Sequence, residues 1–309
     1  MKHLLSFIFI LLPFVLQAQN VLDGIEYLYE SQISVSSHKT PLWLNANKYG
    51  LSSLDKSNGY VRALVKRDIS RDADRKIGFG YGVDFVLPYN YQTTIAIQQL
   101  YAEVRYKRMT LSLGSKCRPM KLKNQSLSSG SQALGINARP VPQLRLALDD
   151  YYSLPFTRGW LAVKGHFAYG YMTDGRWQKD FAAESMKWTD GALYHSKAGY
   201  LKIGKEERPV SFEIGLEMAT VFGGTVHWYD EKQREQVTFK GGHGLSGFFH
   251  AVIPGGSDFQ EDEKGYVNVE GNMLGSWVAS LTYDHEAFSI ALYADHFFED
   301  DSQMLMMDY

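Results

Sequence analysis

The 309-residue sequence has little cysteine, little proline and almost no net charge. Its single cysteine, Cys117, excludes an intrachain disulfide framework and a cysteine-rich zinc or iron–sulfur site. A net charge of −2 leaves no electrostatic signature for nucleic acid, so we expect no nucleic-acid partner. After residue 18, no apolar run approaches the ~20 residues that a membrane-spanning helix needs.

Signatures of catalysis are missing as well. The sequence contains neither a phosphate-binding P-loop nor a G-x-S-x-G nucleophile elbow. His285-Glu286 is not followed by the second histidine of a zinc protease motif. We therefore expect a protein that is not an enzyme and that uses no cofactor and no catalytic metal.

The N-terminus has the pattern of a secretory signal peptide over residues 1–18. Lys2 and His3 give a short positive start, an almost continuous apolar run follows over 4–16, and Ala18 offers a small residue for cleavage. The alternative is an N-terminal membrane anchor, although the run is short for a spanning helix. We expect export and a mature chain of residues 19–309.

What the sequence has in abundance is aromatic residues and glycine, with 20 Tyr, 17 Phe, 6 Trp and 28 Gly. Apolar and polar residues alternate with period two along most of the mature chain, and polar turns interrupt this alternation, as is typical of strands. The pattern predicts about eleven strands. The clear segments are 100–106, 109–113, 144–148, 161–171, 212–218 and 288–292, and weaker ones are 25–35, 59–69, 77–87, 193–203 and 274–284.

Two architectures use such strands: a soluble sandwich and a transmembrane barrel. The expected strand lengths of about 9–13 residues suit a tilted bilayer span. Aromatic residues gather near strand ends, as in the girdles of outer-membrane barrels. Connections also alternate between short ones, such as 107–108, and long polar ones, such as 172–192 and 222–270. We therefore predict an all-β, antiparallel transmembrane β-barrel, with the sandwich as the alternative.

Residues 117–143 form a long stretch without alternation, and they carry four basic residues, Arg118, Lys121, Lys123 and Arg139. A long polar segment between two barrel strands can fold inward and narrow the pore. The alternative is an ordinary solvated loop.

Several runs resemble the capsule assembly Wzi family, as it occurs in Bacteroidetes-type bacteria. They lie in order along most of the mature chain, and no single run is a catalytic signature. The runs are Thr40–Gly50, Asn137–Arg145, Leu154–Trp160 with Lys164-Gly165, Phe212–Gly224, Asn272–Trp277 and His296–Asp300.

This resemblance implies a barrel of about 18 strands in the outer membrane of a Gram-negative bacterium. It also implies that the protein binds or assembles capsular or other surface polysaccharide. With about eleven strands, the chain is then expected to be incomplete at its C-terminal end, and the alternative is a smaller barrel. A general diffusion porin is the alternative function. The expected partners are surface polysaccharide and outer-membrane lipid, and the oligomeric state stays open.

Glycan binding needs flat aromatic surfaces and planar polar groups. Each candidate residue can also be read as a structural residue of the barrel interior. The candidates are Tyr101, Arg139, Gln143, Arg145, Trp160 and Lys164.

Overall fold

The structure is a computed structural model, and the predicted signal peptide lies outside the residues that it describes. In the described part of the chain, no helix is long and apolar enough to cross a membrane. The described residues are 22–91, 93, 95–128, 130–173, 177–181, 188–230, 235–241, 245–252, 259–262, 265–268 and 272–299.

Eleven strands form one antiparallel sheet, and each of them overlaps one of the eleven predicted segments. The all-β, antiparallel prediction is therefore confirmed. The strands are β1 (Ile25–Val35), β2 (Ser57–Arg67), β3 (Ile77–Tyr89), β4 (Ala96–Tyr106), β5 (Met109–Ser115), β6 (Gln143–Ser153), β7 (Leu161–Tyr171), β9 (Leu193–Ile203), β10 (Val210–Phe222), β15 (Asn272–His285) and β16 (Phe288–Glu299).

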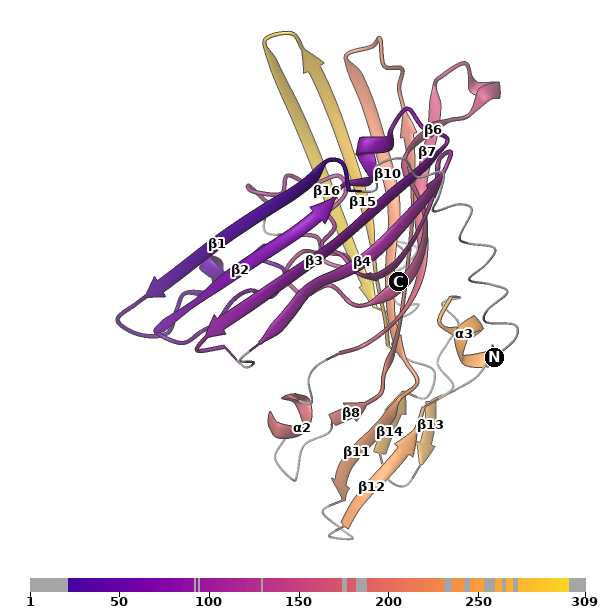
Figure 1. Ribbon diagram of the computed structural model, residues 1–309. Helices are drawn as coiled ribbons and strands as arrows, with labels where there is room; N and C mark the ends of the chain where they lie inside the picture. Colours follow the sequence, from indigo (N-terminus) through magenta and orange to yellow (C-terminus); the bar gives the residue numbers. More distant parts are fainter. Residues whose placement is uncertain are drawn as a thin grey trace, which may run out of the picture.

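The sheet is an up-and-down meander, because successive strands of the sheet pair with each other from β1 to β16. Figure 1 shows the sheet strongly curved, and β1 and β16 form its two edges without pairing to one another among the described residues. Smaller elements occupy the connections: η1 (Leu42–Asn45), η2 (Ile69–Asp72), η3 (Pro155–Thr157), α2 (Trp177–Phe181), β8 (Trp188–Asp190), β11 (Thr225–Asp230), β12 (Glu235–Lys240), α3 (Leu245–His250), β13 (Phe259–Asp262) and β14 (Gly265–Asn268).

The connections at the two ends of the strands differ in length, as the sequence predicted. At one end, which we call the short-turn end, the connections are brief, and the hairpin between β15 and β16 lies there (Figure 1). The opposite, long-loop end carries α2, β8 and β11 to β14. Short-turn connections are 68–76, 107–108, 154–160, 204–209 and 286–287. The long-loop end has the connections 36–56, 116–142, 172–192 and 223–271, together with 90–95, which is itself short.

The two faces of the sheet have inverted polarity compared with a water-soluble protein. On the outer face, Leu111, Leu144 and Leu146 are 47%, 53% and 47% exposed. Their neighbours on the inner face, Ser112 and Arg145, are only 2% and 4% exposed. A soluble sandwich would bury the apolar face instead. An apolar outside around a polar inside is the pattern of an outer-membrane β-barrel.

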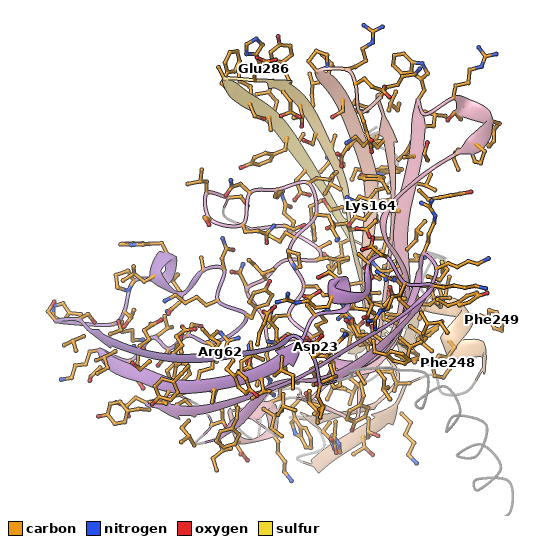
Figure 2. All side chains as sticks on the ribbon, turned by 45° about the horizontal axis from the view of Figure 1, so that its top comes forward. Asp23, Arg62, Lys164, Phe248, Phe249 and Glu286 are labelled. Carbon is orange, nitrogen blue, oxygen red and sulfur yellow. The ribbon has the colours of Figure 1, made fainter. Side chains whose placement is uncertain are left out.

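Helix α3 covers part of the outer face at the long-loop end. The Phe248 ring lies 4.9 Å from Tyr169 and 5.5 Å from Phe222, and the Tyr169 hydroxyl donates to the Phe248 carbonyl at 2.6 Å. His195, which stacks on Tyr169, is completely buried there. Phe249 on the same helix is 67% exposed (Figure 2). The chain thus shields one region of its own outer wall.

Candidate functional site on the inner face

Charged side chains of the inner face are paired across neighbouring strands. Arg62 of β2 binds Asp84 of β3 through Nε–Oδ1 and NH2–Oδ2 contacts of 2.9 and 2.7 Å. Gln99 of β4 donates to the same carboxylate at 2.8 Å. Lys164 of β7 lies 3.9 Å from Glu213 of β10, in another part of the sheet (Figure 2). These pairs satisfy polar groups that face the interior.

Residues 116–142, which we call the inner segment, fold across this inner face. The Cys117 amide donates to Gln99 Oε1 of β4 at 2.8 Å. Ser131 Oγ donates to Glu217 of β10 at 2.8 Å, and Lys123 Nζ lies 2.5 Å from Asp295 of β16. The segment therefore bridges strands that are distant in the sheet. The predicted inward fold is confirmed, and the ordinary solvated loop is excluded.

The inner segment also contacts the first long-loop connection. Asn47 N donates to Asn137 Oδ1 at 2.7 Å, and Tyr49 N donates to the Ile136 carbonyl at 2.7 Å. Tyr49 OH donates to the Arg118 carbonyl at 3.0 Å, and burial raises the pKa of this phenol to about 12. The runs Thr40–Gly50 and Asn137–Arg145, which both carried the sequence resemblance, are thus in direct contact through Asn47 and Asn137, which are 90 residues apart.

An exposed apolar patch in this connection was missed as a site by sequence reasoning. Leu42, Trp43 and Leu44 of η1 are 72%, 77% and 48% exposed. The available signal was a Pro-Leu-Trp-Leu run between polar turns. Contiguous exposed apolar side chains of this kind mark binding surfaces.

Two predicted site residues, Tyr101 and Arg145, lie on either side of the start of the inner segment. Lys116 Nζ lies 4.9 Å from the centroid of the Tyr101 ring and 2.6 Å from Glu103. Arg145 pairs with Asp149 at 3.0 Å. Tyr101 and Arg145 are 6% and 4% exposed, so both belong to the packed interior.

Gln143 and Lys164 also face the interior. Gln143 Oε1 accepts from Ser196 Oγ at 3.4 Å. Lys164 Nζ lies 4.0 Å from the centroid of the Tyr151 ring. Tyr151 OH in turn donates to Glu213 at 2.6 Å, so Lys164 belongs to a local cluster of cation, ring and carboxylate.

The structure does not bring the remaining two predicted residues together. Arg139 is half-buried at the long-loop end, where its NH2 donates to the Thr173 carbonyl at 3.1 Å. Trp160 is 49% exposed at the short-turn end, beside Lys205. Strand β6 separates them, since its 11 residues at about 3.3 Å each span most of the sheet. These two residues therefore cannot contact one short ligand together.

A cavity of about 430 Å³ lies on the inner face near the short-turn end. Its acidic lining residues are Glu103, Asp149 and Asp150. Seven basic side chains also line the cavity, so they outnumber the three acidic ones. They are Arg105, Lys107 and Arg108 near the β4–β5 turn, Lys116, Arg118 and Lys121 of the inner segment, and Arg145 of β6.

Burial and neighbouring cations both lower the pKa of basic residues in this cavity. Burial, together with the nearby Arg145 guanidinium, lowers the pKa of Arg118 to about 10. Burial also lowers the pKa of Lys121. Arg118 and Lys121 were predicted to lie in a basic segment, but neither was predicted to be a site residue.

The described residues offer no group of three or more His, Cys, Asp or Glu side chains that could hold a metal ion. Acidic side chains of the inner face are instead paired with cations, as Asp84 is with Arg62 and Asp295 with Lys123.

Comparison with known proteins adds no argument about this chain. No family model matches the chain, and no curated protein matches it. A solved structure of Salmonella typhi OmpF in complex with daunomycin is similar at a TM-score of 0.29 and 7% identity, covering 89% of this chain and 98% of that one. A likeness at this level carries no argument about function, so the fold rests on strand pairing and on the polarity of the two faces.

Proposed function

We propose that this chain is an outer-membrane barrel protein that binds or assembles capsular or other surface polysaccharide, without catalysing a reaction. The observation that carries the proposal is the inner segment bound across the inner face of a sheet whose outer face is apolar. A barrel interior that is filled by the inner segment is better suited to attaching polysaccharide than to letting solutes diffuse through. The sequence resemblance to the Wzi family supports the same role.

The long-loop end is the surface at which we place the polysaccharide. Trp43 offers an exposed aromatic face, and Arg139 offers a half-buried guanidinium that also donates to the Thr173 carbonyl. Their two chain segments touch through Asn47 and Asn137. An aromatic face packs against the apolar side of a sugar ring, while a guanidinium bonds its hydroxyl or carboxylate groups. Gln143, Arg145 and Lys164 remain candidates on the inner face.

The test is retention of surface polysaccharide by cells that express variants of the protein. A deletion strain and a strain with Trp43→Ala and Arg139→Ala should release glycan into the medium. Trp160→Ala, at the opposite end of the sheet, is the matched aromatic control and should retain it. Unchanged surface glycan in the deletion strain would show that the proposal is wrong.

A diffusion porin is the competing function. A porin would let ions pass through its interior, whereas the proposed attachment protein would not. In a planar lipid bilayer, the purified protein should show no stable open-channel current, because the inner segment occupies the inner face. A steady ohmic conductance from the intact protein would favour the porin instead.

A further inference from the structure

The cavity near the short-turn end has more positive charge than its own acidic residues can neutralise. Of its cations, Lys116 and Arg118 share the one carboxylate of Glu103, at 2.6 and 3.6 Å, and Arg145 pairs with Asp149. Within the described residues, Lys121 forms no ion pair. Bringing like charges together in a partly buried space is unfavourable unless an anion joins them.

One donor in this cavity also lacks a partner. Arg105 Nε is buried and has no hydrogen-bond acceptor among the described residues. The Arg108 guanidinium lies 4.7 Å from the centroid of the Tyr152 ring. A buried donor without an acceptor costs roughly 1–3 kcal/mol, so an anion that supplies acceptors is favoured.

The size and the walls of the cavity limit what it can hold. A volume of about 430 Å³ falls within the range of small-molecule sites. One wall is the start of the inner segment, from Lys116 to Lys121, and another is the β4–β5 turn. The ligand must therefore be small, and it must enter away from the long-loop surface that carries Trp43.

From this geometry we infer that the cavity binds a small organic anion that carries phosphate or carboxylate groups, for which acidic sugars serve as probes. Planar guanidinium groups of Arg105, Arg108 and Arg118 match both kinds of oxyanion. Lys121 adds a point charge from the inner segment. The site is separate from the polysaccharide surface of the proposed function and lies toward the other end of the sheet.

Isothermal titration calorimetry of the whole mature protein in detergent tests this inference. The probes are fructose 1,6-bisphosphate for the phosphate class, digalacturonate for the carboxylate class, and maltose as a neutral sugar of similar size. We expect at least one anion to bind and maltose not to bind. Lys121→Gln should weaken anion binding by about tenfold, as expected when one charged hydrogen bond is lost. Lys240→Gln, an exposed position of β12 at the long-loop end, is the charge-matched control and should leave the affinity unchanged.

Strand content by circular dichroism confirms that each variant is folded before titration. Absence of binding by both anions at 10 mM and low salt, or equal affinity in Lys121→Gln and the intact protein, would overturn the inference. The result is independent of the polysaccharide proposal. Loss of surface glycan in Trp43→Ala with Arg139→Ala can occur with or without anion binding here, so the two failures are distinguishable.

Discussion

At the scale of single residues, the short-turn end is organised by a buried ion pair. Arg67 NH1 lies 2.9 Å from Asp72 Oδ2, and the two side chains are 4% and 2% exposed. The Phe79 amide also donates to Asp72 at 3.0 Å, and Arg67 Nε donates to the carbonyl of Asp23 at 2.9 Å. Arg67, held by Asp72 of the β2–β3 turn, therefore connects this turn to the chain that leads into β1, where Asp23 lies (Figure 2).

Asp72→Asn should lower the free energy of unfolding by about 3–5 kcal/mol at neutral pH, because it leaves Arg67 buried without a counter-charge. The Arg67 guanidinium lowers the pKa of Asp72 from its ordinary 3.8. The carboxylate thus stabilises the fold above that ordinary value, and this stabilisation is lost as the pH falls through the lower folded value. The difference between intact protein and variant should therefore shrink below about pH 4. Urea unfolding in detergent, followed by tryptophan fluorescence, measures it, and the exposed Asp74→Asn is the control. Equal stability of the two variants would contradict the role of the pair.

A second residue-scale prediction concerns the close approach of a ring to the backbone. A Cβ added at Gly82 would lie 2.6 Å from Cε1 of Tyr101, whereas a Cβ at Gly199 meets nothing within 4 Å. Gly82→Ala should destabilise the protein by about 1–3 kcal/mol through overpacking, and Gly199→Ala should be close to neutral. The same urea titration compares them. A neutral Gly82→Ala would mean that the Tyr101 ring is free to move.

Sequence alternation predicted which residues face inward at these positions, but it could not predict their partners. Tyr101 and Arg145 follow the period-two pattern of their strands, so their side of the sheet was predictable. Arg118 and Lys121 lie in a segment without alternation, and their surroundings come from strands elsewhere in the chain. The Lys123–Asp295 pair shows the problem, since 172 residues separate its members.

At the scale of elements, the inner segment is held by a few polar contacts and by a small cluster of apolar side chains. Leu122 and Leu134 pack against Tyr200 and its neighbours, while Ser131 and Lys123 bond Glu217 and Asp295. The segment contains tryptic sites that its packing should protect.

Ser131→Ala combined with Lys123→Gln should loosen the inner segment without touching the strands. Trypsin cleavage after Lys121 should become about 10–100-fold faster, since two polar contacts that oppose local opening are lost. Mass spectrometry of a digestion time course in detergent measures the rate. Leu127→Ala, an 85% exposed position in the same segment, is the control and should cleave as the intact protein does. An unchanged rate in the double variant would show that other contacts hold the segment.

At the scale of elements, the strands could be predicted from the sequence, whereas contacts between distant elements could not. The eleven strands and the alternation of short and long connections were predictable, because both follow from local pattern. The seating of α3 on the outer wall was not, since it depends on Tyr169 and Phe222, which lie on other strands. Likewise, nothing local indicated that residues 40–50 would meet residues 136–139.

At the scale of the whole molecule, the decisive feature is which face of the sheet is apolar. Leu146 lies at mid-strand on the outer face and is 47% exposed, and it is paired with Leu111 and Phe167 of the neighbouring strands. Ile203 lies on the same face at the end of β9, at the short-turn end, and is 39% exposed. If lipid covers this face, the two positions differ in depth and therefore in their tolerance of charge.

Leu146→Arg should destabilise the protein in phospholipid vesicles by about 2–4 kcal/mol, and Ile203→Arg by about 0–1 kcal/mol, because the cost of a cation falls from the bilayer midplane to the interface. Guanidinium titration of vesicle-reconstituted protein gives both values. In detergent micelles, which adapt to a local charge, the gap between the variants should narrow. A soluble sheet whose outer face met only water or another protein layer would show no such dependence on position along the strand. Equal destabilisation by the two arginine substitutions in vesicles would therefore show that lipid does not cover this face. The surface-polysaccharide proposal would then lose its physical basis.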